Sequence, residues 1–285
     1  IASKILGLYL TKRQGVLMCG VPYHSALTYI SKLINNGYKV AICEQVGEED
    51  KKTKLFKRKV VRVVTPGTVI EEELLNSKSS NYLCAFVVDI VGWGICWIDI
   101  STTEFFAINK LDDRNLDHLL SLISRISPKE MVTDKKTYEY LKSNCIDLFE
   151  SVNLHEIKET DFHFKNEAVW KNNPLAYKSI CLCLSYLRSL EMDISNLRPI
   201  YYDDNITLRL DDVAIKTLEL VSSDYEGGYS LFDVVDGSKT PMGSRLVRRW
   251  ILNPLNDIYL INKRLDAVEF LYKNASTSSS NMDPT

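Results

Sequence analysis

The chain of 285 residues is 45% hydrophobic and 25% charged, with a formal net charge of −2. These ordinary values allow one to three globular domains and exclude a polycation, which weakens any argument for nucleic-acid binding from bulk charge alone. No apolar run approaches the roughly 18–20 residues that cross a bilayer, and the N-terminus lacks the charged-then-apolar pattern of a signal peptide, so we expect no membrane partner.

The first region, residues 1–75, alternates helix and strand. Residues 25–36 carry apolar side chains at helical spacing and end before Gly37, which suits a left-handed C-terminal cap. Strands are expected at residues 38–44 and 59–64, and the Pro-Gly pair after Thr65 predicts a turn. The region therefore predicts an α/β layer.

Positive charge is concentrated in this first region. It holds 12 Lys and Arg against 7 Asp and Glu, and its net charge of +5 leaves −7 for the rest of the chain. A run of cations contains Lys51, Lys52, Lys54, Lys57, Arg58, Lys59 and Arg62. Such a run is usually a solvated loop leading into a strand, although cations on a strand also suit a DNA backbone. Alternation along a strand lets only half of them share a face.

The second region covers residues 80–175. Three apolar runs at 82–90, 93–100 and 104–109 predict a β-meander, followed by helices at 113–125 and 135–143 with a strand at 130–133 between them. Residues 150–175 are expected to be irregular. The order βββαβα is typical of the ribonuclease H fold, in which Asp89 and Asp99 could serve metal-dependent cleavage. Glu104 is the only further acid on the meander, so a packed domain without catalysis is favoured.

The third region, residues 176–285, is expected to be all-α. A helix at 179–190 is apolar nearly all round and should be buried. Asp212 can cap a helix at 213–221, Thr240 can cap one at 241–252, and Asp257 can cap a last helix reaching Lys273 with its apolar side facing inward. Residues 276–285 suggest a frayed end or a foreign tail.

No catalytic, metal or cofactor site is predicted in this chain. Gly237-Ser-Lys-Thr240 lacks the spacing of a phosphate-binding loop and has no strand ahead of it. Seven cysteines without a Cys-x-x-Cys pair, and four scattered histidines, favour buried free thiols over a zinc site or a disulfide framework.

Two groups of sequence blocks are more specific than these single signals. The first group is Leu10-Thr-Lys-Arg13, Met18-Cys-Gly-Val-Pro-Tyr-His24, Val40-Ala-Ile-Cys-Glu-Gln45 and Arg58-Lys-Val-Val-Arg-Val-Val-Thr-Pro-Gly-Thr68. The second is Asp212-Val-Ala-Ile-Lys-Thr-Leu-Glu-Leu220, Ser230-Leu-Phe232, and Thr240-Pro-Met-Gly-Ser-Arg-Leu246 through Pro254-Leu255. In this order they resemble the mismatch-binding domain and the start of the helical core of the MutS family of DNA mismatch-recognition proteins.

The resemblance implies a multidomain protein, α/β and then all-α. Its parts are an N-terminally truncated mixed α/β mismatch-binding domain over 1–75, a ribonuclease H-like connector without nuclease activity over 80–175, and the start of the helical core, or lever, domain over 176–285. It also implies DNA contacts by Arg13, Met18, Pro22, Tyr23, His24 and Arg58. Arg13 and Arg58 would contact the backbone, and the loop from Met18 to His24 would lie in the minor groove near the mispair.

The family further implies double-stranded DNA with mispairs or small loops as ligand, a homodimer, a MutL-type partner and a cytoplasmic, nucleoid-associated location. Its full-length members are DNA-dependent ATPases that use ATP and Mg. The family's Phe-x-Glu wedge does not occur in this sequence, and the loop Gln14-Gly-Val-Leu17 is shorter than usual. We therefore expect weak, salt-sensitive duplex binding with little mismatch preference. The alternatives are a nuclease centred on Asp89 and Asp99, or a protein-interaction fragment without DNA binding.

Overall fold

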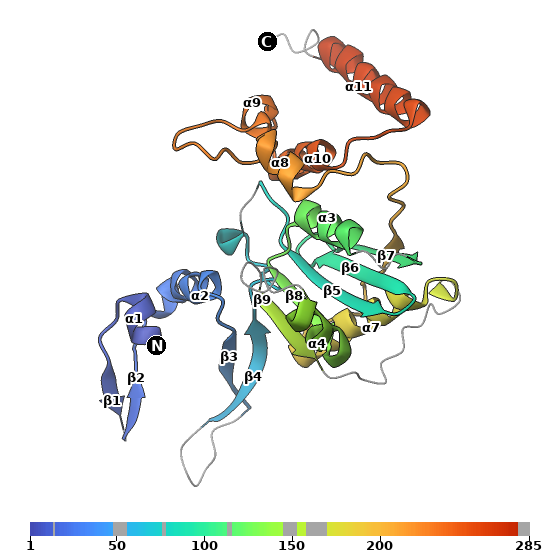
Figure 1. The fold of residues 1–285 in the computed structure, drawn as a ribbon. Coiled ribbons are helices and arrows are strands. Elements are labelled where there is room, and N and C mark those ends of the chain that lie inside the picture. Colours follow the sequence, from blue (N-terminus) through green and yellow to red (C-terminus); the bar gives the residue numbers. More distant parts are fainter. Residues whose placement is uncertain are drawn as a thin grey trace, which may run out of the picture. The chain divides into compact units, whose positions relative to one another are not determined.

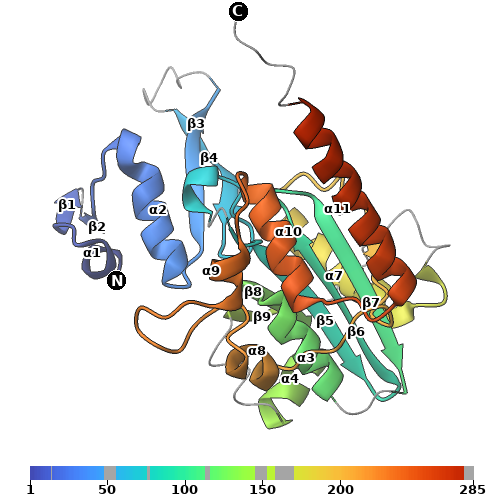
Figure 2. The ribbon, with the colours of Figure 1, turned by 90° about the horizontal axis from the view of Figure 1, so that it is seen from above.

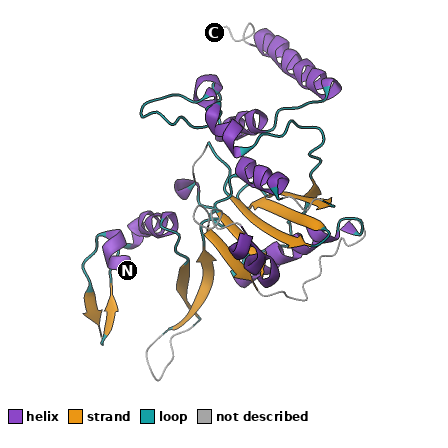
Figure 3. Ribbon diagram, viewed as in Figure 1, coloured by secondary structure: helices purple, strands orange, loops and turns teal. Residues whose placement is uncertain are grey.

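The computed structural model describes residues 1–13, 15–47, 56–75, 78–112, 116–144, 153–157 and 170–278. The chain forms two compact units, Ile1–Tyr202 and Asp203–Thr285. Helices and strands mix in the first unit, whereas the described elements of the second are helical (Figure 3). The mixed α/β character predicted for the chain is therefore confirmed.

The first part of unit 1 contains two small antiparallel sheets and two helices (Figure 1). Helix α2 ends as predicted: Gly37 has a φ of 79°, its N–H donates to the Ile34 carbonyl at 2.8 Å, and the Tyr38 N–H donates to the Leu33 carbonyl at 3.0 Å. The elements are α1 (Ala2–Leu6), β1 (Thr11–Arg13), β2 (Val16–Met18), η1 (Tyr23–Ser25), α2 (Ala26–Asn35), β3 (Val40–Val46), β4 (Lys57–Val64) and η2 (Glu72–Leu74).

A six-stranded sheet forms the rest of unit 1, in the order β10-β7-β6-β5-β8-β9. Strands β5, β6 and β7 are antiparallel, whereas β8 and β9 run parallel to β5, and β10 runs parallel to β7. The strands are β5 (Tyr82–Asp89), β6 (Gly92–Asp99), β7 (Glu104–Leu111), β8 (Glu130–Asp134), β9 (Asn153–Ile157) and β10 (Ile200–Tyr201). The meander and β8 were predicted; β9 lies in a segment expected to be irregular, and β10 was not predicted.

Helices cover both faces of this sheet, and the alternation along β5 explains why (Figure 2). Leu83, Ala85 and Val87 point to the face covered by α7 (Pro174–Ser189). Cys84 and Phe86 point to the opposite face, which is covered by α3 (Asp117–Ile126) and α4 (Lys135–Asn144). Both sets are buried, so each face of the sheet has its own apolar core.

Two residues of the sheet fix the start of α7. The Asn109 side-chain oxygen accepts hydrogen bonds from the backbone N–H groups of Leu175 and Ala176, at 2.9 and 3.2 Å. Gly94 lies so close that an added Cβ would be 2.2 Å from the Leu175 carbonyl carbon. The helix is buried over much of its surface, as predicted, but it packs on the sheet and not among the helices of the third region.

Unit 2 is built from short, well-capped helices and one long one. These are α8 (Asp212–Thr217), α9 (Leu231–Val235), α10 (Pro241–Leu252) and α11 (Ile258–Ser278). Thr240 caps α10 and Asp257 caps α11 as predicted, through bonds from Gly243 N–H at 3.2 Å and Leu260 N–H at 2.9 Å. Helix α9, which begins with a capping box at Ser230 and Asp233, was not predicted.

Three expectations for this unit need correction. The cap of α8 is Asp211, whose side chain accepts from Ala214 N–H, while Asp212 lies inside the helix and pairs with Lys216 at 2.6 Å. Helix α8 ends at Thr217, so the expected helix to residue 221 was too long. The apolar stripe of α11 at Ile258, Ile261, Leu265, Val268 and Leu271, expected on an inner side, is exposed among the residues that the structure describes.

The α10 cap can be tested directly. Replacing Thr240 with Ala should cost about 1 kcal/mol of helix stability, because the Gly243 N–H loses its acceptor. Hydrogen exchange of the α10 amides measures this loss as local opening. Thr240→Ser keeps the hydroxyl and should exchange like the wild type; equal protection in the Ala and Ser variants would show that the cap contributes nothing.

Candidate DNA-binding surface

The β1–β2 hairpin carries two of the six predicted contact residues. Arg13 pairs with Val16 and Met18 pairs with Thr11, and the Thr11 hydroxyl donates to the Met18 carbonyl at 2.9 Å. All described residues of both strands are exposed, including the apolar side chains of Val16 and Leu17. The hairpin therefore offers an unburied surface on which cationic and apolar side chains lie together. Met18, expected in a loop, is the last residue of β2.

Three further predicted residues lie in the turn that leads into α2. Pro22 precedes η1 with a φ of −63°, and Tyr23 and His24 form its first two residues. All three are exposed, and Tyr23 is 95% exposed. An aromatic side chain this open has no packing role within the described residues. It is free to stack on or lie against a ligand surface.

The β3–β4 ribbon carries the sixth residue, Arg58. It pairs with Gln45, and its neighbours Lys57 and Lys59 pair with Val46 and Glu44. Lys57 and Lys59 thus point to one face of the ribbon and Arg58 to the other, as the alternation predicts. All three cations are exposed, and none has an ion pair with another described residue. Lys51, Lys52 and Lys54 lie outside the described residues.

Arg62, the last cation of the run, serves the fold. Its guanidinium lies 2.6 Å from one carboxylate oxygen of Glu71, and it donates to the Thr68 carbonyl at 3.1 Å. Both side chains are less than a quarter exposed. This bidentate pair closes the turn after β4 and leaves Arg62 unsuited to a phosphate. Sequence reasoning grouped Arg62 with the other cations because its partner lies nine residues further along the chain.

The predicted residues are distributed over separate elements. Arg13 and Met18 lie on one two-stranded sheet and Arg58 on another, and these two sheets do not pair with each other. Tyr23 and His24 form the start of η1, which precedes α2. In chain order, α2 lies between the two sheets (Figure 1). All six predicted side chains are thus exposed, and both the β1–β2 hairpin and the β3–β4 ribbon carry exposed cations.

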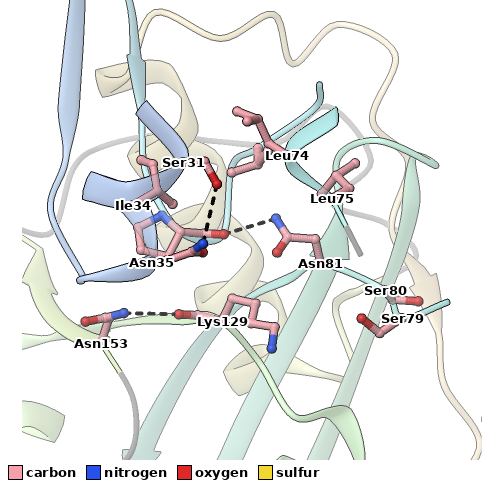
Figure 4. A pocket seen from close by; sticks show the side chains of 12 residues that line it. Ser31, Ile34, Asn35, Leu74, Leu75, Ser79, Ser80, Asn81, Lys129 and Asn153 are labelled. Carbon is pink, nitrogen blue, oxygen red and sulfur yellow. Dashed lines mark hydrogen bonds between the residues drawn. The ribbon is translucent and has the colours of Figure 1, made fainter. Parts of the chain in front are cut away.

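A hollow of about 390 Å³ lies where this part of the chain meets the six-stranded sheet (Figure 4). Its apolar wall includes Ile34, Val69 and Leu74. Two polar side chains in its lining bind other segments: the Asn81 amide donates to the Pro66 carbonyl at 3.1 Å and the Asn153 amide to the Lys129 carbonyl at 3.5 Å. These bonds hold the walls of the hollow together.

The carboxylates of the nuclease alternative do not converge. Asp89 ends β5 opposite Gly92, whereas Asp99 ends β6 opposite Tyr82. Seven residues of strand separate these ends, which is about 23 Å at roughly 3.3 Å per residue. Asp99 accepts bonds from Asn81 and Ser101, and Asp89 pairs with Lys136 at 2.8 Å. Among the described residues no three His, Cys, Asp or Glu side chains are grouped to hold a metal ion.

No helix in the described part of the chain is both long and apolar enough to cross a membrane.

Comparison with known proteins places the whole chain in one family. MutS domain I matches residues 1–73, MutS domain II matches 81–201, and MutS domain III matches 213–283. The chain is 37% identical over 96% of its length to the DNA mismatch repair protein MutS of Caldanaerobacter subterraneus subsp. tengcongensis. It is 35% identical over 95% to that of Thermotoga sp. strain RQ2, and 39% over 97% to that of Borrelia turicatae.

Three successive domains of one multidomain protein class therefore follow each other in this chain. The chain belongs to the MutS family. It spans about a third, 34%, of the length of these curated relatives. The resemblance seen in the sequence blocks is confirmed.

Proposed function

We propose that residues 1–75 contact the backbone and minor groove of duplex DNA, as part of a protein that recognises mispairs and starts their repair. The observation that carries this proposal is the ordered match to three MutS domains, supported by relatives named for DNA mismatch repair. The exposure of Arg13, Met18, Pro22, Tyr23, His24 and Arg58 supports it further. The cations would fix the position on the backbone, and the turn at Tyr23 would approach the groove.

The remaining domains are assigned on the same basis. We propose that the six-stranded sheet is a ribonuclease H-like connector that acts without nuclease chemistry, because its acids lie at opposite ends. The connector would extend through α7, which packs on the sheet. Residues from Asp203 would begin the helical core. In the whole protein we propose a homodimer at the nucleoid that hydrolyses ATP with Mg and recruits a MutL-type partner.

Charge reversal tests the proposed DNA contact. The double variant Arg13→Glu with Arg58→Glu should weaken binding to a duplex at least about tenfold at low salt, because each reversal replaces attraction to a phosphate by repulsion of about 1 kcal/mol or more. Fluorescence anisotropy with a labelled duplex, with and without a G·T mispair, measures both affinity and mispair preference.

A matched control keeps the same charge change on another surface. Lys135 and Lys142 are exposed on α4, which packs on the six-stranded sheet. The double variant Lys135→Glu with Lys142→Glu should therefore change duplex affinity by no more than about twofold, which is the effect of net charge alone. An equal loss of duplex affinity in both double variants would contradict the DNA contacts assigned to Arg13 and Arg58. Unchanged affinity in both would favour a protein-interaction role.

A further inference from the structure

A buried carboxylate joins two parts of unit 1. Glu130, the first residue of β8, has no exposed surface. One of its oxygens accepts from the Thr65 hydroxyl and from the Gly67 N–H at 3.0 Å. The other accepts from the Tyr186 hydroxyl at 2.5 Å and lies 3.2 Å from Nε2 of His155. Thr65 and Gly67 follow β4, so this one side chain binds the end of the ribbon to the sheet.

The partners of Glu130 come from several elements around it. His155 lies on β9 and Tyr186 on α7, while Lys39 lies just before β3. The Lys39 ammonium donates to the Tyr186 hydroxyl at 2.9 Å and lies 3.9 Å from Glu130. Both strands of the ribbon are therefore attached to the same carboxylate, β4 directly and β3 through Tyr186.

The charge of Glu130 is well supported at this place. Burial raises the pKa of the Glu130 carboxyl, but the adjacent His155 ring and hydrogen bonds from Thr65, Tyr186 and Gly67 outweigh burial and hold this pKa below its usual value. Burial, together with the adjacent Glu130 charge, raises the pKa of Tyr186, which therefore keeps its donor proton. A carboxylate with this many donors stays ionised although it is buried.

Backbone packing at the same place leaves little freedom. A Cβ added to Gly67 would lie 2.9 Å from the Glu130 Cβ and 3.1 Å from the Leu83 Cβ, so the turn after β4 rests directly on the sheet. The Val63 N–H donates to the Leu190 carbonyl at 3.4 Å, which links β4 to the residue that follows α7. Both contacts orient the ribbon relative to the sheet.

We propose that Glu130 is a positioning residue that fixes the β3–β4 ribbon, and with it Arg58, in the orientation needed to bind duplex DNA. This inference rests on the proposed function. Glu130 lies at the base of the ribbon, so it acts through the ribbon and makes no contact with DNA itself. We call the contacts of Glu130 with Thr65, Gly67 and Tyr186 the joint between the ribbon and the sheet. If the joint is loosened, the ribbon keeps its cations but takes up a wider range of orientations. Duplex binding is then weaker, because binding must restrict these orientations again.

An isosteric pair of variants in the full chain tests the joint. Thr65→Val removes the hydroxyl that binds Glu130, whereas Thr133→Val removes a hydroxyl that binds the Phe86 carbonyl within the sheet. Both threonines are fully buried and valine keeps their volume, so each change removes a buried hydroxyl without opening a cavity. The Thr65 hydroxyl makes the stronger bond because its acceptor is a carboxylate, and it also contacts the Thr68 hydroxyl at 2.8 Å. Thr65→Ser is the conservative variant that keeps the joint.

Two readouts decide the outcome. Thr65→Val should speed hydrogen exchange at the Val63 and Gly67 amides at least tenfold and weaken binding to a duplex about fivefold, at a temperature where every variant is folded. Thr133→Val and Thr65→Ser should match the wild type in both. Unchanged hydrogen exchange in Thr65→Val would contradict the proposed joint. So would a Thr133→Val variant whose hydrogen exchange and duplex affinity change as much as those of Thr65→Val. A wild type that does not bind DNA would refute the proposed function and the positioning role, while the exchange result would still establish or refute the joint.

Discussion

Replacing Gly94 with Ala should lower the unfolding free energy of unit 1 by at least about 3 kcal/mol. The added methyl carbon would lie 2.2 Å from the Leu175 carbonyl carbon and 2.4 Å from the Ala176 nitrogen. Both are backbone atoms, so no side-chain rotation relieves the clash. Helix α7 must move off the sheet, which also breaks the bonds from its first turn to Asn109.

Chemical denaturation followed by tryptophan fluorescence measures this loss, since Trp93 and Trp97 lie on the same strand. The matched control is Gly20→Ala, because Gly20 has open space around its Cβ position and no positive φ. That variant should be neutral or gain up to about 1 kcal/mol from the stiffer unfolded chain. A Gly94 variant as stable as the Gly20 variant would mean that α7 does not approach β6 as described.

Neutralising Glu130 is expected to have the second large effect on stability. Glu130→Gln should cost about 3 kcal/mol near neutral pH, because several charge-assisted hydrogen bonds become neutral ones in a buried place. The folded-state pKa of Glu130 is lowered below its reference value of 4.5, so its contribution is fully present above about pH 4.5. It is lost as the pH falls through the folded-state pKa.

Urea unfolding of the wild type and of Glu130→Gln between pH 7 and pH 3 tests this dependence. The stability difference should stay constant down to about pH 4.5 and then shrink as the wild-type carboxylate takes up a proton. Lys39, His155 and Tyr186 face residue 130 in both proteins. The comparison is therefore made with His155→Gln in both proteins, so that the pH dependence of the difference reports on the Glu130 carboxyl. A difference that grows on acidification would contradict the assigned pKa direction.

The regular parts of the fold were predictable because their sequence patterns are strong. Continuous apolar runs identify β5, β6 and β7, which are largely buried on both faces. A threonine followed by proline identifies the start of α10, and Gly37 identifies the end of α2. In each case the signal lies within a few residues of the element that it predicts.

The missed elements depend on partners that are distant in the sequence. Strand β9 contains Asn153, His155 and Glu156, and it becomes a strand by pairing with β8. Strands β1 and β2 have three residues each, too few for a periodic pattern to be visible. Helix α7 was identified as buried, but an apolar helix does not indicate which surface it covers.

In the candidate site, too, features with a local sequence signal could be predicted, whereas features that depend on distant partners could not. Exposed cations such as Arg58 could be chosen from the sequence, but Arg62 could not be separated from them without knowing that Glu71 lies against it. Glu130 was missed altogether. An acid at the start of a buried strand is a visible signal, yet its partners Thr65 and Tyr186 lie 65 and 56 residues away. Sequence alone does not bring such residues together.

The salt dependence of duplex binding tests the proposed backbone contacts most directly. Each phosphate contact adds about 0.9 to the steepness of the log–log plot of affinity against salt concentration. Arg13→Ala with Arg58→Ala should therefore reduce the slope of the full chain by about 1.8, whereas Lys135→Ala with Lys142→Ala should leave it unchanged. A slope that stays at the wild-type value without Arg13 and Arg58 would contradict the proposal that these residues contact DNA.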